Sequence, residues 1–164
     1  MRFGVFCFSL LASASAFAPQ GSTTRSSRFT VGPLQDAVST NTGMTPEEHD
    51  IAMEKATKAM TAFTNKYLAN TKTKLCTDKS VPSVVIKGLA EHKVNLGAPL
   101  CPCRFYDNKE EEAKDGYWNC PCVPMRERHE CHCMLFLTED NPFAGDESEI
   151  SVEEVISGTS GLDM

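Results

Sequence analysis

Hydrophobic residues recur at helical spacing in the segment that follows position 44. They lie three or four residues apart with lysines off the stripe, so a helix over residues 46–70 would bury one face. The stripe consists of Ala52, Ala56, Met60, Phe63 and Tyr67. Thr45 supplies a capping hydroxyl, Pro46 occupies the first helical position and two glutamates follow in the first turn. The pattern predicts a helix that forms part of the core.

A second apolar stripe predicts another helix, which Ser80 can cap. Gly97 followed by Pro99 supplies the stop signal. Gly88 lies inside this helix, where we expect it to carry a modest cost in helix propensity. The apolar positions are Val81, Val84, Val85, Leu89 and Leu96.

Regular periodicity is lost after residue 98, where cysteines and prolines dominate. A charged stretch, Asn108 to Lys114, has room for two helical turns, and the apolar run Met134 to Leu137 is either a short strand or a buried connector. Ser151 and Glu154 have the spacing of a capping box, which predicts a last helix over residues 152–157. We therefore expect a mainly α, small and irregular fold in which short helices pack around cysteine loops. Metal or disulfides must hold those loops together.

The first 44 residues have the composition of targeting segments. Residues 1–16 contain Arg2, an apolar run and the small residues Ala14-Ser-Ala16, as in a cleavable signal peptide. Residues 17–44 are rich in Ser and Thr and poor in acids, as in a plastid transit peptide. The junction Ala14-Ser-Ala-Phe-Ala-Pro19 resembles the cleavage motif of bipartite presequences in algae with complex plastids. The alternative is a plain secretory protein. The functional domain is expected over residues 45–164.

The charge of the chain disfavours binding to nucleic acid. The formal net charge is −6 over 164 residues. The first 44 residues contain three arginines and only one acid, so the remaining part carries 13 basic and 21 acidic residues. Affinity for phosphate backbones needs clustered Lys and Arg. The one compact basic run, from Arg126 to His129, includes a glutamate and is better suited to a small docking patch.

Six of the eight cysteines form three triplets. These are Cys101-Pro-Cys103, Cys120-Pro-Cys122 and Cys131-His-Cys133. Two cysteines one residue apart rarely bond to each other, because the ring would be strained. Three disulfides between triplets would suit a secreted protein but not a reducing stroma. Zinc would take four thiolates, yet its ligand pairs are usually two to four residues apart.

An iron–sulfur cluster also takes four thiolates and leaves two cysteines over. Those two can form a disulfide that is reduced and reoxidised, and a cluster, unlike zinc, can supply its electrons. The count therefore favours a cluster beside a redox-active disulfide. Spacing alone does not say which four cysteines bind.

The three triplets and their flanks resemble the catalytic (beta) subunit of ferredoxin-thioredoxin reductase. The similarity covers nearly all of residues 45–164 and extends upstream through Cys76-Thr-Asp78 and Gly88-Leu-Ala90. The matching segments are Cys101-Pro-Cys-Arg104, Tyr117-Trp-Asn-Cys-Pro-Cys-Val-Pro-Met-Arg-Glu-Arg128, Glu130-Cys-His-Cys-Met-Leu-Phe-Leu-Thr138 and Phe143-Ala-Gly145.

The resemblance implies a site and a reaction. Thioredoxin disulfide would be reduced with electrons from ferredoxin, in a heterodimer with a small variable (alpha) subunit, in the plastid (chloroplast) stroma. The implied ligands of one 4Fe–4S cluster are Cys101, Cys120, Cys122 and Cys131. Cys103 and Cys133 would form the active-site disulfide, with Cys103 as the nucleophile and Cys133 near the cluster. His132 would transfer protons, as a group that titrates near neutrality can.

Two positions depart from the family pattern. Phe105 stands where the family usually has His, and His129 where it usually has Lys. Outside the triplets, Cys76 is expected to be a buried or free thiol. We also expect His92 to be solvated on a charged helix face, and Trp118 to pack over the cysteine loops.

Overall fold

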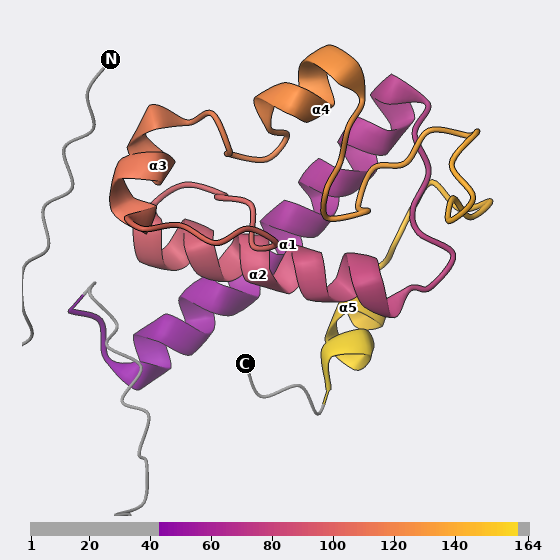
Figure 1. The fold of residues 1–164 in the computed structure, drawn as a ribbon. Coiled ribbons are helices and arrows are strands. Elements are labelled where there is room, and N and C mark those ends of the chain that lie inside the picture. The colour runs from indigo at the N-terminus through magenta and orange to yellow at the C-terminus, as the bar shows by residue number, and fades with distance from the viewer. Residues whose placement is uncertain (1–42, 161–164) are drawn as a thin grey trace, which may run out of the picture. The chain divides into compact units, whose positions relative to one another are not determined.

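Five helices make up the regular structure of residues 43–160, the part of the chain that the computed structural model describes (Figure 1). No strand forms within this part, where isolated β-bridges join loop residues instead. None of the helices found there has the length and apolar character to cross a membrane. The helices are α1 (Pro46–Thr71), α2 (Ser80–Leu96), α3 (Lys109–Asp115), α4 (Val123–Arg128) and α5 (Val152–Thr159).

Helix α1 confirms the predicted capping and extent. The backbone N–H of Glu48 donates to the Thr45 hydroxyl, and the Thr45 N–H donates to the Glu48 carboxylate. The buried face includes Ala56, Met60 and Leu68, with Phe63 and Tyr67 of the predicted stripe half-buried.

Helix α2 matches its predicted range but differs at its start. Ser80 does not cap it: Ser80 is the first helical residue, and its hydroxyl donates to the Asp78 carboxylate at 2.7 Å. Gly97 ends the helix in the left-handed conformation, as predicted. Val85, Ile86, Leu89 and Ala90 are fully or almost fully buried, whereas the predicted Val81, Val84 and Leu96 are only half-buried. The buried face is therefore wider than the stripe, because α2 has neighbours on more than one side.

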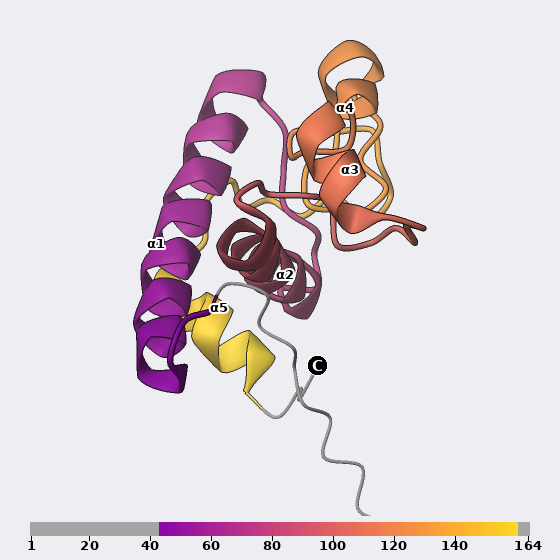
Figure 2. The ribbon, with the colours of Figure 1, turned by 90° about the vertical axis from the view of Figure 1, so that its left-hand side faces the viewer.

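Those neighbours form layers on either side of α2. Figure 2 shows α2 between α1 and the segment that carries α3 and α4. Helix α5 packs against both α1 and α2. The Asn65 amide of α1 also bonds both the N–H and the C=O of Ile150, at 3.0 and 2.9 Å, just before α5. The long helices thus form a support for the loops of residues 98–138.

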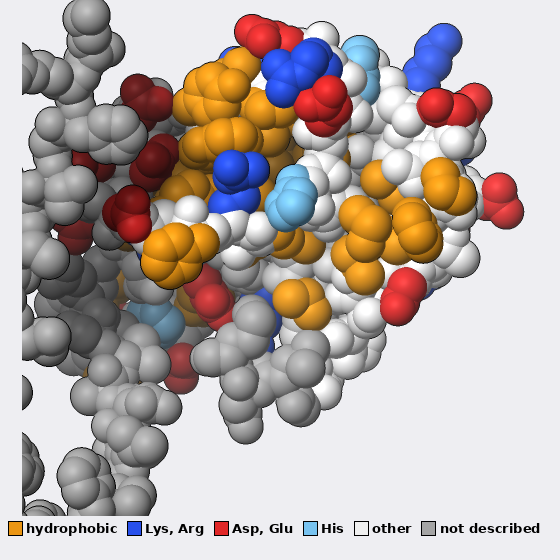
Figure 3. All heavy atoms as spheres, in the orientation of Figure 1, with side chains coloured by type: hydrophobic (Ala, Val, Ile, Leu, Met, Phe, Trp, Pro, Cys, Tyr) orange, Lys and Arg blue, Asp and Glu red, His pale blue; other side chains and the backbone are white. Residues whose placement is uncertain are grey.

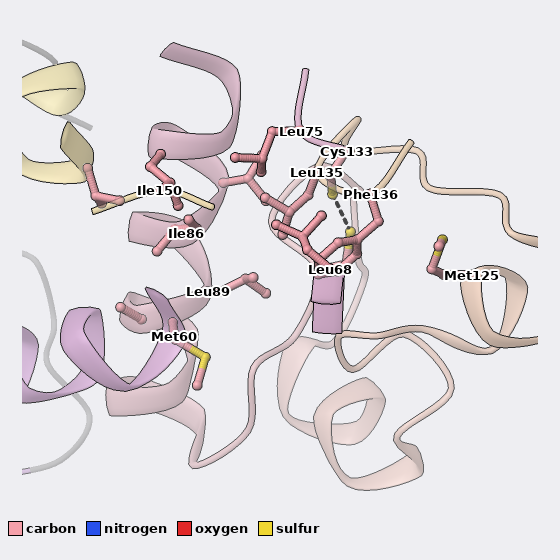
Figure 4. Packing of buried hydrophobic residues seen from close by; sticks show 14 of the residues in the cluster. Met60, Leu68, Leu75, Ile86, Leu89, Met125, Cys133, Leu135, Phe136 and Ile150 are labelled. Carbon is pink, nitrogen blue, oxygen red and sulfur yellow. Dashed lines mark hydrogen bonds between the residues drawn. The ribbon is translucent and has the colours of Figure 1, made fainter. Parts of the chain in front are cut away.

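The hydrophobic core extends from the helices into the cysteine loops. Phe136 is 1% exposed, and its ring centroid lies 4.5 Å from that of Tyr67 and 6.5 Å from that of Phe63. Cys133 and Met125 belong to the same buried cluster as Leu68, Ile86 and Leu89 (Figure 4). Burial in this core therefore fixes parts of the loops that have no regular structure.

Two of the short helices, α3 and α5, begin at side chains that cap their first turns. Asn108 accepts from the N–H groups of Glu110 and Glu111 at the start of α3, and the predicted capping box of Ser151 and Glu154 starts α5. Residues 134–137 are a buried connector rather than a strand, with one bridge between Lys74 and Leu137. Helix α4 was not predicted, because six residues that include Pro124 are too few for a period to emerge. The predicted segments 1–16 and 17–44 lie almost wholly outside the described residues.

Gly88 has a packing role that helix propensity does not reveal. A Cβ atom at this position would lie 2.7 Å from Cβ of Pro102, the central residue of the first cysteine triplet. Gly88 is itself buried. The expectation of a modest propensity cost alone is thus incomplete, since glycine here permits a close approach of the triplet to α2.

Gly88→Ala is expected to destabilise the protein, although alanine favours a helix by about 1 kcal/mol relative to glycine. The overlap with the rigid proline ring should cost about 1–3 kcal/mol and lower the midpoint of thermal unfolding. The double variant Gly88→Ala/Pro102→Gly tests the cause, because it lacks the proline ring. The changes in the free energy of unfolding that the two single substitutions cause should therefore be strongly non-additive. Additive changes would show that the overlap is relieved elsewhere.

Lys79 joins the start of α2 to α5 through two carboxylates. Its Nζ lies 2.6 Å from Oε1 of Glu154 and 2.7 Å from Oε2 of Glu147. The bond with Lys79, followed by those with Ser151, lowers the pKa of Glu154 to about 2.

Glu154→Gln keeps the capping acceptor but removes the charge. Since the folded state holds the wild-type carboxylate at a lower pKa than the unfolded chain, its stabilisation is present above pH 4.5 and disappears as the pH falls towards about 2. The wild-type protein should therefore be the more stable at pH 7, with a difference that narrows on acidification. Thermal unfolding of the wild-type protein and of Glu154→Gln between pH 7 and pH 3 measures this difference in stability. A difference that stays constant with pH would contradict the prediction.

Candidate functional site

Five of the six triplet cysteines line one cavity of about 480 Å³. They come from all three triplets: Cys101, Cys120, Cys122, Cys131 and Cys133. The remaining one, Cys103, is the one exposed cysteine in the described part of the chain. On the face drawn in Figure 3, hydrophobic side chains, a class that here includes cysteine, gather between α3 and α4 over these loops. The fold therefore brings the predicted site residues together.

Backbone pairing holds the first two triplets beside each other. The N–H of Cys101 donates to the C=O of Trp118 at 3.0 Å, and the N–H of Cys120 donates to the C=O of Pro99 at 2.8 Å. Leu100 and Asn119 form an antiparallel bridge between them. Cys122 is the residue directly before α4. Cys101, Cys120 and Cys122 are thus positioned by main-chain contacts, before any metal is considered.

The third triplet lies near the start of the loop that joins α4 to α5. The N–H groups of Phe136 and Leu135 donate to the Cys131 sulfur. Burial nevertheless raises the pKa of the Cys131 thiol, and it raises that of Cys120 more strongly. Binding of a metal at these sulfurs must therefore release protons that burial otherwise retains.

The thiols of Cys101, Cys103 and Cys133 contact one another. The Sγ atoms of Cys101 and Cys133 are 2.9 Å apart, as the dashed line in Figure 4 marks. Hydrogen bonds from Cys103 and Cys133 lower the pKa of Cys101, whereas the bond with Cys101 raises the pKa of each donor. All seven cysteines of the described segment are free thiols. The predicted disulfide pairs Cys133 with Cys103, whereas the sulfur that lies 2.9 Å from Cys133 belongs to Cys101.

The third proposed catalytic residue, His132, is exposed and also lines the cavity. It lies between Cys131 and Cys133 in the sequence, at the border between the cavity and solvent. That position is compatible with a proton carrier. His129, in contrast, ends α4 in the left-handed conformation with φ 58°.

Several residues that support the site were not identified from the sequence. The guanidinium carbon of Arg104 lies 3.6 Å from the ring centroid of Trp118, and both line the cavity. The Tyr106 hydroxyl donates to the C=O of Cys101 at 2.9 Å. Trp118 thus packs over the cysteine loops as expected. No spacing rule would have revealed the partners of Arg104 or Tyr106.

Two other expectations have different outcomes. Cys76 is a buried free thiol, as predicted. The prediction that His92 is solvated is wrong: its side chain is half-buried, and Nδ1 lies 2.7 Å from the C=O of Leu100. The loop before Cys101 folds back over α2 and covers this ring.

The cysteines on the cavity wall are a donor set that could hold an iron–sulfur cluster. Over residues 43–160, no group of three or more His, Cys, Asp or Glu side chains is arranged to hold a metal ion. In a 4Fe–4S cluster each thiolate binds a different iron, so the four ligands surround a body rather than a point. A cavity with cysteines from three segments on its wall provides such a set.

Comparisons with known proteins show the family of the chain. A family model described as "Ferredoxin thioredoxin reductase catalytic beta chain" matches residues 50–158. A chloroplastic ferredoxin-thioredoxin reductase catalytic chain of Spinacia oleracea is 59% identical over 109 residues, which cover 66% of this chain and 76% of the relative. The corresponding chain of Synechocystis sp. is 59% identical over 104 residues, 63% of this chain and 88% of the relative. That of Guillardia theta is 62% identical over 87 residues, 53% of this chain and 85% of the relative. The chain therefore belongs to the family of ferredoxin-thioredoxin reductase catalytic chains.

Proposed function

We propose that this chain is the catalytic subunit of an enzyme that reduces the thioredoxin disulfide with electrons from reduced ferredoxin. A 4Fe–4S cluster, when bound, would supply two electrons in sequential one-electron steps to an adjacent disulfide between Cys103 and Cys133. The observation that carries the proposal is the division of the cysteines. Five line one cavity, whereas Cys103 alone among the described cysteines is exposed.

The proposed ligands of the cluster are Cys101, Cys120, Cys122 and Cys131. All four line the cavity, and three of them lie in the backbone pairing or directly before α4. When bound, the cluster would supply electrons one at a time. It would thus connect ferredoxin, which donates one electron, to a disulfide, whose reduction needs two.

The chain's own residues carry out the disulfide exchange. The Cys103 thiolate attacks one sulfur of the thioredoxin disulfide, and the displaced thioredoxin sulfur takes up a proton. The Cys133 thiolate then attacks Cys103, which releases the second thioredoxin thiol and forms the Cys103–Cys133 disulfide. Two electrons from two ferredoxins reduce that disulfide again. Attack requires an accessible sulfur, and Cys103 fulfils this requirement.

His132 is proposed to transfer the protons in these steps. It adjoins Cys133 in the sequence and lies at the exposed border of the cavity. An imidazole changes its charge near neutral pH, so it can both donate and accept a proton under working conditions.

The remaining assignments concern location and assembly. We propose that residues 1–16 and 17–44 are a bipartite presequence that directs residues 45–164 to the plastid stroma. The chloroplastic relatives support a plastid location. A variable subunit is proposed to complete a heterodimer, because relatives of this chain are named as catalytic chains.

Cys103→Ser and Cys133→Ser are each expected to abolish thioredoxin reduction, because disulfide exchange needs both sulfurs. Both variants should retain iron, since neither residue is a proposed ligand. Ferredoxin-dependent turnover with thioredoxin measures the effect. Cys76→Ala, which changes a buried thiol outside the site, is the matched control and should remain active. Turnover in either serine variant would contradict the proposal.

Metal analysis tests the cluster independently of activity. Residues 45–164, purified without oxygen together with the variable subunit, should contain about four irons and four sulfides per chain. Cys120→Ser should lose most of both, as it removes a ligand. One zinc without sulfide would instead favour a zinc-binding interaction module. Full iron content with an inert Cys103–Cys133 pair would favour a simple electron carrier.

A further inference from the structure

Phe105 is an exposed aromatic side chain beside the exposed thiol. It is 91% exposed, more than any other large hydrophobic side chain in residues 43–160. One residue, Arg104, separates it from Cys103, so the two Cα atoms are at most about 7 Å apart. A phenyl ring left in water gains nothing for folding, since the hydrophobic effect favours burial. The position therefore needs an explanation other than stability.

Both neighbours of Phe105 are fixed. Arg104 stacks over the Trp118 ring at 3.6 Å, and Tyr106 is buried with its hydroxyl bonded to the C=O of Cys101. With the residues on either side anchored, the direction of Phe105 is set by the backbone. The contacts that hold the cysteine loop thus keep the backbone of Phe105 at the surface. A backbone position that is fixed in advance loses little freedom when a partner covers it.

Aromatic residues continue the surface from this point. Trp118 lies under Arg104, and the Tyr117 ring packs edge-on against Trp118 with centroids 4.7 Å apart. Tyr117 is itself 39% exposed. Aromatic residues and arginine are enriched where proteins contact other proteins and supply most of the binding energy there.

We infer that Phe105 is an apolar contact for the protein whose disulfide is reduced, and that it sets the affinity of the chain for that protein. The inference rests on the proposed function, in which Cys103 attacks the disulfide. For a bond to form between Cys103 and a partner sulfur, the partner's surface must cover the residues within a few ångströms of that thiol. Phe105 is among them and offers apolar area that only such a partner buries. The partner is therefore a protein disulfide surrounded by apolar surface.

Phe105→Ser in the assembled heterodimer tests the inference. The KM for thioredoxin should rise about tenfold, as loss of one apolar contact of hot-spot strength predicts, with kcat changed by less than about twofold. Phe105→Leu keeps an apolar side chain and should restore most of the affinity. Ile156→Ser is the matched control, because Ile156 is 56% exposed on α5, away from the cysteine loops. It should leave the KM unchanged.

A small disulfide separates docking from positioning. Reduction of hydroxyethyl disulfide by the reduced heterodimer needs the Cys103 thiol but not a protein surface, so Phe105→Ser should leave its rate unchanged. An equal loss with both substrates would mean that Phe105 positions Cys103, and would overturn the inference. The inference would also be overturned if Phe105→Ser raised the KM for ferredoxin or weakened assembly with the variable subunit. An unchanged KM for thioredoxin would overturn it as well. Turnover by Cys103→Ser would instead refute the proposed function itself.

Discussion

The backbone pairing of residues 99–101 with residues 118–120 is the interaction on which the rest of the site depends. It places Cys101 and Cys120 side by side through hydrogen bonds of 3.0 and 2.8 Å. Gly88 then lets Pro102 pack directly on α2, which fixes the pair against the hydrophobic core. Without that support the loops would lack a defined shape, because no strand orders them in the described part of the chain. The positions of the sulfurs thus follow from a short pairing and one close contact.

The core determines which sulfurs are sheltered. Cys101 and Cys133 are 6% and 8% exposed, whereas Cys103 lies on the outer side of the same turn as Cys101. A single residue separates the two cysteines of each triplet, so a turn at the central residue can send the two side chains in different directions. Burial raises the pKa of Cys120 and Cys131, and the bond with Cys101 raises that of Cys103 as well, so access rather than pKa distinguishes Cys103. Large partners can reach Cys103 because it is exposed, whereas the other triplet cysteines line the cavity.

The sequence predicted features that repeat or that rest on local capping. Helices α1 and α2 were predicted by their apolar periods, α3 by the charged stretch from Asn108 to Lys114, and α5 by the capping box of Ser151. The grouping of the cysteines followed from their triplets. Helix α4, the cover over His92 and the stack of Arg104 on Trp118 were not predicted, because each depends on contacts between segments that are distant in sequence or too short to show a period. The role of Gly88 likewise depends on Pro102, fourteen positions away.

The separation of buried and exposed sulfurs matches the different demands of the two proposed partners. Electrons can pass through a layer of protein, so a donor does not need to touch the sulfurs that line the cavity. Disulfide exchange requires direct contact between sulfur atoms, so one thiol must reach the surface. Exposure of all six would invite unspecific oxidation, since accessible thiolates are the ones that oxidise. A fold that exposes Cys103 alone among the described cysteines, two positions from an exposed aromatic side chain, satisfies both demands.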